Sequence, residues 1–202
     1  MASNMQVTPL GTFCFGALIT PRINNMNPDA PPEWLAAIQC SEAESQAMFE
    51  AIEAALEDAR AKQPRFPKES KGLRFPWRQA TEKAEGSDER VPLEGQLLWV
   101  FKRKSIVKRY GEEVKNTPPT LYDNGGKVCT GQVEEIGLRS TGKVIYRPYW
   151  YCQPGNSGIG FGLEGFQIGE LKESNNTPDL PPIGGNFTSE QEETVDLGNV
   201  FL

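Results

Sequence analysis

The sequence predicts a mainly β protein with one long helix, built as a small, partly open antiparallel barrel with long loops and a flexible acidic C-terminal tail. Three observations support this class: about five short runs with strand-like alternation, a single segment with helical periodicity, and long stretches rich in Pro and Gly between them. With 202 residues, the chain has room for one domain or for one domain plus a tail. We therefore expect a folded domain over residues 1–172 and a tail over residues 173–202.

Two strands are predicted before the helix. Residues 12–20 place Phe13, Phe15 and Ile19 in alternation with smaller residues, which is typical of a half-buried strand, and prolines mark both ends of this run. Residues 33–40 are predicted to form the second strand, although their alanines suit a helix better. A loop rich in proline separates the two strands.

The helix is predicted to begin at Ser41. Ser41 and Glu44 have the spacing of a capping box, in which the hydroxyl and the carboxylate each accept a hydrogen bond from a free backbone N–H group. Apolar residues then recur at helical spacing until Pro64 and Pro67 end the segment. The predicted helix has roughly 22 residues and a length of about 33 Å. Its apolar stripe consists of Met48, Phe49, Ile52, Ala55, Leu56 and Ala59.

After the helix, a basic stretch is followed by further strands. Residues 64–90 are expected to be mostly irregular, and residues 95–104 to form a strand that runs into a basic cluster. A short strand is predicted at residues 120–122, and the Asp-Asn-Gly-Gly sequence after it indicates a turn.

The clearest β feature is a hairpin near the end of the domain. Residues 143–152 and 159–171 are rich in β-branched and aromatic side chains, and the Gln-Pro-Gly-Asn-Ser-Gly sequence between them indicates a turn. Pro148 restricts the first arm to a sheet edge or to a bulge. The alternating glycines of the second arm are expected to flatten one face, which permits curvature or the close approach of another chain.

The absence of histidine excludes Ser-His-Asp and Cys-His nucleophiles, histidine metal ligands and imidazole acid–base chemistry. The four cysteines are widely spaced and form no C-x-x-C pair, so we expect reduced thiols and no zinc site. Acidic residues adjacent in sequence point in different directions and seldom form a catalytic dyad. The glycine run after residue 157 lies in a strand and lacks the Lys-Ser/Thr of a phosphate loop. We expect no enzymatic activity, no cofactor and no metal.

The net charge of −6 hides an uneven distribution. Residues 173–202 contain six acidic residues and no basic residue, so residues 1–172 carry equal numbers of both signs. Within that domain, residues 33–58 contain seven acidic residues and no basic one, whereas residues 60–83 contain eight basic residues against two acidic ones. A basic surface is therefore compatible with the low overall isoelectric point.

Basic and aromatic residues alternate in two of the predicted strands, a pattern that favours binding of single-stranded DNA. Cations bind the phosphates and flat rings stack on exposed bases. In residues 143–152 we expect Val144, Tyr146 and Trp150 to face the core; in residues 95–104 we expect Leu98 and Val100 to do so. The alternative is a structural role, in which the aromatic residues of these strands form the core of the β-sheet. The predicted DNA-binding residues are Trp77, Arg78, Trp99, Phe101, Arg103, Lys104, Lys108, Arg109, Lys143, Arg147, Tyr149 and Tyr151.

The acidic tail is expected to be disordered and to fold back on the basic face, where it would compete with DNA. Its apolar end, Val200 to Leu202, would suit a pocket on a partner protein. The alternative is a tail that only increases solubility. The residues assigned to these roles are Glu190, Glu192, Glu193, Asp196 and Phe201.

The order of these features resembles that of the tailed-phage single-stranded DNA-binding proteins catalogued as the DUF2815 group. The resemblance is carried by the early strand, by the strand and helix EWLAAIQCSEAESQAMFEAIEAALEDA, by TLYDNG at residues 120–125, and by the paired strands RPYWYCQPGNSGIGFGLEGFQI. It implies an OB-like barrel, binding without sequence preference, a role in phage replication or recombination, and a tail that recruits phage or host replication proteins. The tail ends in Val-Phe-Leu instead of at an aromatic residue, which is a departure from that pattern.

The chain has no secretory signal and no apolar run long enough to span a membrane, so we expect it in the cytoplasm of a bacterial host cell. An alternative function is a non-catalytic phage interaction or assembly protein whose tail recruits partners. In that case the cations would balance the acidic helix across a homodimer.

Overall fold

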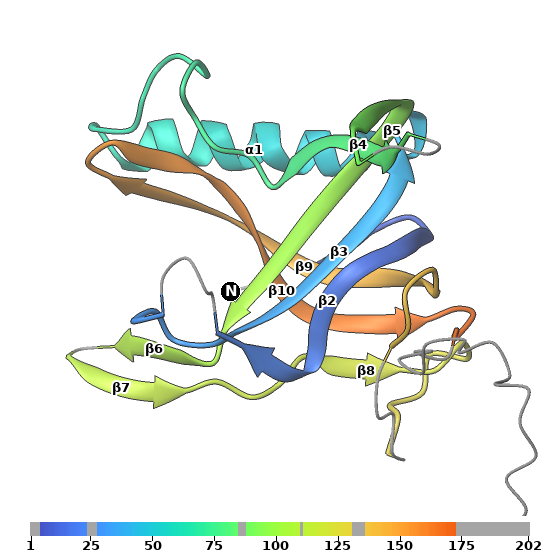
Figure 1. Cartoon of the computed structure of the whole chain (residues 1–202). Coiled ribbons are helices and arrows are strands. Elements are labelled where there is room, and N and C mark those ends of the chain that lie inside the picture. The colour runs from blue at the N-terminus through green and yellow to red at the C-terminus, as the bar shows by residue number, and fades with distance from the viewer. Residues whose placement is uncertain (1–4, 24–27, 85–87, 110, 131–135, 173–202) are drawn as a thin grey trace, which may run out of the picture.

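A computed structural model describes residues 5–23, 28–84, 88–109, 111–130 and 136–172. Within these residues, most strands belong to one eight-stranded sheet, and a single α-helix lies across one end of it (Figure 1). The strands are β1 (Gln6–Val7), β2 (Gly11–Arg22), β3 (Glu33–Ser41), β4 (Trp77–Lys83), β5 (Arg90–Lys104), β6 (Ile106–Arg109), β7 (Glu112–Lys115), β8 (Thr120–Tyr122), β9 (Thr141–Gln153) and β10 (Asn156–Ile168); the helix is α1 (Gln46–Lys62).

Five strands form a circuit, which confirms the partly open barrel. β2 pairs with β3, β3 with β5, β5 with β10, β10 with β9, and β9 with β2. Two joints are narrow, because β5 and β10 share a single pair of residues and β9 and β2 share two. The expectation of a purely antiparallel barrel is wrong at one joint, since β10 runs parallel to β5. β10 also pairs in parallel with β8, outside the circuit.

The predicted helix is shorter than expected. The capping box does form: the Glu44 N–H donates to Ser41 Oγ (3.2 Å) and the Ser41 N–H donates to Glu44 Oε2 (3.3 Å). It caps a 3-10 turn over Ala43–Ser45, after which α1 has 17 residues. Ser41 itself stays in β3, because its pairing with Gln96 of β5 extends the sheet to that point.

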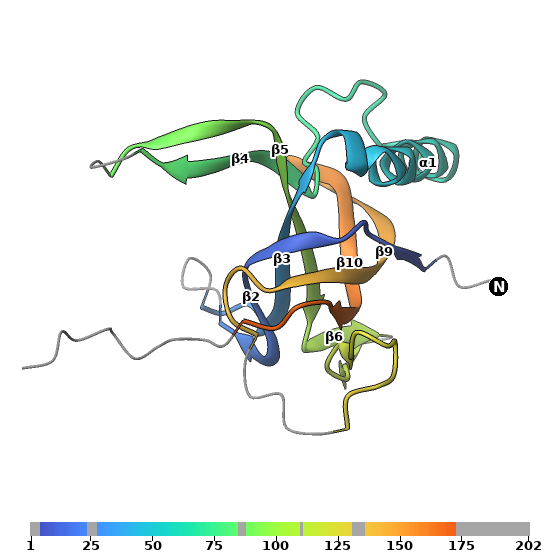
Figure 2. The same cartoon turned by 90° about the vertical axis from the view of Figure 1, so that its right-hand side faces the viewer.

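The structure confirms the predicted strands at residues 12–20, 33–40 and 120–122 and the late hairpin. Four strands were not predicted, namely β1, β4, β6 and β7. β4 lies in the stretch that was expected to be irregular, and β5 begins five residues earlier than expected. β4 and the first part of β5 pair with each other and extend as an arm away from the barrel (Figure 2). β6 and β7 form a separate small hairpin. These segments are mostly exposed and polar, so they lack the alternating burial that identifies a strand in sequence.

The main core fills the inside of the barrel and continues to the buried face of α1. The helix contributes Met48, Ile52 and Leu56, all buried, from the predicted apolar stripe. At the centre, the Trp99 ring stacks on the Phe161 ring (centroid distance 5.8 Å, interplanar angle 7°), and its Nε1–H donates to Ser45 Oγ (3.0 Å). A smaller cluster on the other face of the sheet consists of Ala37, Ala80 and Leu98.

The hairpin of β9 and β10 is the most extensive pairing of the sheet. β9 pairs with β1 and β2 only through residues 141–146, so among the described strands its second half has β10 as its one neighbour. Pro148 lies in this second half, which confirms the edge position, and the bulge of the hairpin falls instead at Leu163 to Gly165 of β10. All four cysteines are free thiols. No helix among the described residues is long and apolar enough to cross a membrane.

Asp58 of α1 ties the helix to the hairpin. It forms an ion pair with Lys62 (Oδ1 to Nζ, 2.5 Å) and accepts a hydrogen bond from Trp150 Nε1–H of β9 (3.0 Å). The hydrogen bonds from Lys62 and then from Trp150 hold the pKa of the Asp58 carboxyl below its ordinary value of 3.8. Because the charged form is favoured in the folded state, this contribution to stability is present at neutral pH and is lost as the pH falls through the lowered pKa.

We expect Asp58→Asn to lower the melting temperature at neutral pH, because the amide keeps an acceptor for Trp150 but loses the charge. The difference from the wild type should shrink as the pH falls below 3.8. Thermal melts of both proteins from neutral pH to below pH 3.8 test this expectation. Two melting curves that shift in parallel with pH would contradict the assignment.

Candidate nucleic-acid interface

One side of the barrel carries a continuous row of positions across five strands. We define the outer sheet face as the side chains of β2, β3, β5, β10 and β9 that point away from the main core. The register aligns Ala17, Leu35, Lys102, Gly162 and Arg147, one from each strand. None of these residues is buried. Since neighbouring strands lie about 4.8 Å apart, the Cα atoms of Lys102 and Arg147 are separated by about 10 Å with only a glycine between them.

Two tyrosines of β9 lie opposite glycines of β10, where Gly158, Gly160 and Gly162 form what we call the glycine strand. The Tyr149 ring packs over Gly160, where an added Cβ would overlap it. Gly162 continues the same surface, with ring carbons of Tyr149 3.8 Å from an added Cβ there. Tyr149 is 45% exposed, so part of its ring remains open to solvent. The Tyr151 ring lies beside it at a centroid distance of 6.3 Å. The glycines therefore let the Tyr149 ring pack directly against the strand, and we call this partly exposed ring the tyrosine platform.

The platform carries no charge at neutral pH. Burial raises the pKa of the Tyr149 phenol, and the neighbouring Tyr151 and Glu33 raise it further. A neutral, partly exposed ring suits stacking on a base.

The cations of this face are held by two carboxylates. Glu164 accepts from Arg103 (Nη1 to Oε2, 2.6 Å) and pairs with Arg147 (Nε to Oε1, 3.6 Å). Glu33 pairs with Lys102 (Nζ to Oε2, 3.5 Å), and in the sheet it also lies opposite Lys104. Within the described part of the chain, the ion pairs of the exposed cations Arg147 and Lys102 are long, so phosphate oxygens can compete for these cations.

Some of the predicted residues gather here and others do not. Arg147, Tyr149 and Tyr151 lie on the outer sheet face, with the side-chain alternation expected for β9. Lys143 is exposed on the same strand, about 13 Å along it from Arg147. Lys104 lies on the same side of β5 as Lys102 and opposite Glu33, and Arg78 of β4 lies opposite Leu98. Arg103 lies beside this face and contacts it through Glu164.

The predicted outward positions of Trp99 and Phe101 are wrong. Both rings are fully buried (0% exposed) in the main core, so neither can stack on a base. The expected alternation was displaced by one residue, which exchanges the two faces of β5. Leu98 and Val100 are also apolar, so both faces of this strand look alike in sequence. The larger rings occupy the larger core, and Leu98 joins the small cluster under the arm.

Three further predicted residues lie at the edge of the outer sheet face or away from it. Trp77 is 37% exposed, and its ring packs edge-on against Phe49 of α1 (5.5 Å), while the residue also lines a groove beside Lys102. Lys108 and Arg109 belong to the β6–β7 hairpin, where acidic residues lie opposite both. This hairpin lies at the end of the molecule away from α1 (Figure 1). The tail residues Glu190, Glu192, Glu193, Asp196 and Phe201 lie outside the described residues.

Sequence reasoning missed Lys102, Arg74 and Arg22. Lys102 belongs to the same basic run as the predicted residues Arg103 and Lys104. Arg74 is exposed beside the end of the glycine strand, where its backbone pairs with Gly158, and no sequence signal places it there. Arg22 is exposed and lies opposite Glu33.

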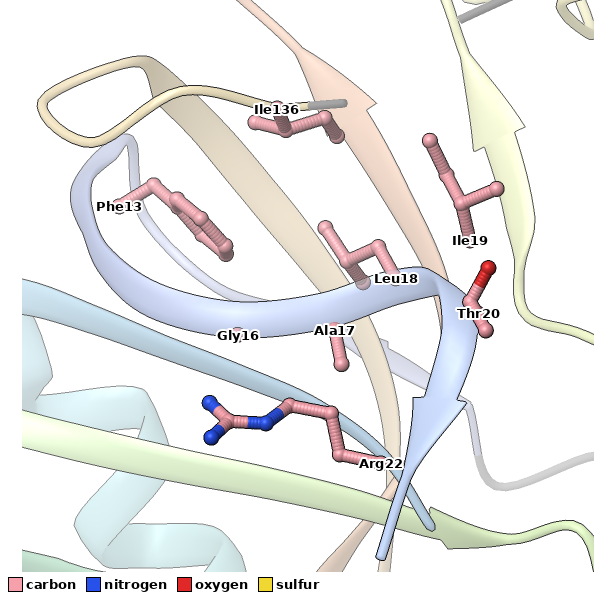
Figure 3. Close-up of a pocket in the computed structure, with 8 residues that line it drawn as sticks. All are labelled: Phe13, Gly16, Ala17, Leu18, Ile19, Thr20, Arg22 and Ile136. Atoms are coloured by element: carbon pink, nitrogen blue, oxygen red, sulfur yellow. The ribbon is translucent and has the colours of Figure 1, made fainter. Parts of the chain in front are cut away.

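A pocket of about 270 Å³ lies where β2 bends. It opens because the pairing of β2 with β3 is interrupted between Ala17 and Arg22. Phe13, Leu18 and Ile136 lie on one side of the β2 ribbon and Arg22 on the other (Figure 3). Among the described residues that line it, most are apolar and the charged one is this arginine.

Comparison with solved structures reveals a shared architecture. The structure of gp2.5, a single-stranded DNA-binding protein of bacteriophage T7, superposes with a TM-score of 0.60 at 20% identity and covers 88% of this chain and 97% of that one. The single-stranded DNA-binding protein of bacteriophage Enc34, in complex with single-stranded DNA, gives 0.59 at 12% identity and covers 85% and 89%. This chain has the OB-like fold of these phage proteins. No family model and no curated protein matches the sequence, so the resemblance to the DUF2815 group stays a prediction.

Proposed function

We propose that this protein binds single-stranded DNA without sequence preference, through residues 1–172, as a phage protein of DNA replication or recombination in the bacterial host cell. The observation that carries the proposal is the glycine strand of β10, with a tyrosine platform and Arg147 on one side and Lys102 on the other. The names of the structural neighbours, one of them solved with single-stranded DNA, support it.

The geometry suits a strand whose bases are unpaired. Phosphates displace counterions from Arg147, Lys102 and their neighbours, which supplies affinity without reading sequence. The Tyr149 face offers stacking, which is worth about 1–3 kcal/mol per base and tolerates any base. No catalytic group is required for either contact.

A titration with labelled oligo-dT and with a duplex of equal length, over a series of salt concentrations, tests the function. If about four phosphates are neutralised, log K should fall against log salt with a slope of about −3 for the single strand. Tighter binding of oligo-dT than of the duplex is expected. Absence of binding to either DNA at low salt would overturn the proposal and favour the alternative of an interaction protein.

The acidic tail is proposed to compete with DNA for the outer sheet face and to recruit replication proteins. Deleting residues 173–202 should then raise the affinity for oligo-dT, most strongly at low salt. A full-length variant with Gln at 190, 192 and 193 and Asn at 196 serves as the matched control, because it keeps the length of the tail and removes charge. Unchanged affinity in both proteins would remove the competition and leave the tail as a partner-binding or solubilising segment.

A further inference from the structure

A groove of about 290 Å³ lies on the outer sheet face, beside Lys102. Its floor is formed by apolar side chains of three strands, Phe15 of β2, Leu35 of β3 and Val100 of β5. The register explains this floor, because Phe15 and Val100 both lie opposite Ala37 on β3. None of the three floor residues is fully buried.

One wall of the groove is the segment before β4, which includes Phe75. This segment is held on two sides by backbone hydrogen bonds. The Val100 N–H donates to the Pro76 carbonyl (2.8 Å) on the β5 side, and the Ile159 N–H donates to the Arg74 carbonyl (2.9 Å) on the β10 side. The wall is therefore tied to the sheet on both sides and is positioned before any ligand arrives.

Two cations bracket the groove. Arg78 and Lys102 both line it. Arg78 of β4 lies opposite Leu98 of β5, so it and Lys102 lie on either side of Val100 along the direction of β5. The backbone positions of Leu98 and Lys102 are about 13 Å apart, at a rise of about 3.3 Å per residue. The site thus has an apolar, partly aromatic middle and a positive charge toward each end.

These features fit one nucleotide of a single strand. Such a nucleotide carries a flat base, and its sugar is flanked along the backbone by two phosphates. The volume lies at the lower limit of ligand pockets, about 300 Å³, which is room for one base and too little for a base pair. A base in a duplex would have to leave its partner, at a cost of a few kcal/mol, before it could enter.

We propose that this groove takes up one unpaired nucleobase between Phe15 and Phe75, with the flanking phosphates on Arg78 and Lys102, and that it gives the protein its preference for single-stranded over double-stranded DNA. The inference rests on the proposed function. It assigns to the groove a role distinct from that of the tyrosine platform, which can stack on any exposed base end.

The test fills the groove in the full-length protein. Val100→Phe places a ring where the base would lie, and Leu35→Phe fills the same space from β3, so that a folding defect in one variant does not decide the result. Thr81→Phe, on the exposed part of the arm, is the matched control for an added ring. Circular dichroism and melting temperature identify which variants are folded.

We expect each filled variant to bind oligo-dT about tenfold or more weakly than the wild type, while binding to a duplex stays unchanged because the outer cations remain. The wild type should bind an oligomer of abasic residues less tightly than oligo-dT. The ratio of these two affinities should be closer to one in the filled variants. Thr81→Phe should behave as the wild type.

The outcomes separate the two proposals. If the filled, folded variants bind oligo-dT as the wild type does while Arg147→Ala weakens binding, the groove proposal fails and the proposed function stands. If filling weakens single-stranded and duplex binding equally, the groove is not the element that discriminates them and the proposal fails. If the wild type binds no single-stranded DNA, both fail.

Discussion

The double substitution Arg147→Ala and Tyr149→Ala is expected to weaken binding of oligo-dT strongly while leaving the melting temperature nearly unchanged. Loss of one stacked base costs about 1–3 kcal/mol, or roughly 5- to 150-fold in affinity. Loss of one phosphate contact should in addition reduce the magnitude of the salt slope by about 0.7. Arg147 is exposed and Tyr149 is 45% exposed, so the buried contact that is removed is mainly that of the Tyr149 ring with Gly160. Fluorescence anisotropy over a salt series, with parallel thermal melts, measures the two effects.

The Glu164→Gln variant is the matched control, because it should change the DNA affinity in the opposite direction. Its carboxylate now holds both Arg103 and Arg147, and the amide would release them for phosphates. We therefore expect tighter binding of oligo-dT and a steeper salt dependence. A double variant that binds as the wild type, or a Glu164→Gln variant that binds more weakly, would place the DNA on another face.

The β9 face could be predicted from the sequence because its alternation is unambiguous. Charged residues at 143 and 147 cannot lie in the core without partners, and this fixes the inward direction of Val144 and Tyr146. In β5 both sets of alternating residues are apolar between Leu97 and Phe101, so no such constraint exists. The direction is set there by α1 and β10, which supply the larger cavity for the rings.

The remaining features of the site depend on contacts between distant segments. The position of Arg74 follows from its pairing with Gly158, and the groove follows from the way residues 74–77 bridge the gap between β10 and β5. Neither has a periodic signal in a single sequence. The glycines of β10 were expected to allow curvature or the close approach of another chain. In the structure, the backbone at Arg74 and the Tyr149 ring approach them, both from the same chain.

The substitution Trp99→Ala is expected to have the largest effect on stability of any change on β5. The side chain is fully buried, stacks on Phe161 and donates to Ser45, so its removal leaves a large cavity at the junction of barrel and helix. Such truncations lower the free energy of unfolding by about 3–5 kcal/mol. Urea denaturation of the wild type and the variant measures the difference.

Trp99→Phe decides between a core role and a binding role for this residue. It keeps an aromatic ring in the core and loses the hydrogen bond, which contributes about 0.5–1.5 kcal/mol. Ser45 Oγ still donates to the Ser41 carbonyl (2.8 Å), so the hydroxyl keeps a partner. The variant should therefore be modestly less stable and should bind oligo-dT like the wild type. Reduced DNA affinity at unchanged stability would instead mean that the ring reaches the DNA, which contradicts the burial on which the assignment of the two faces of β5 depends.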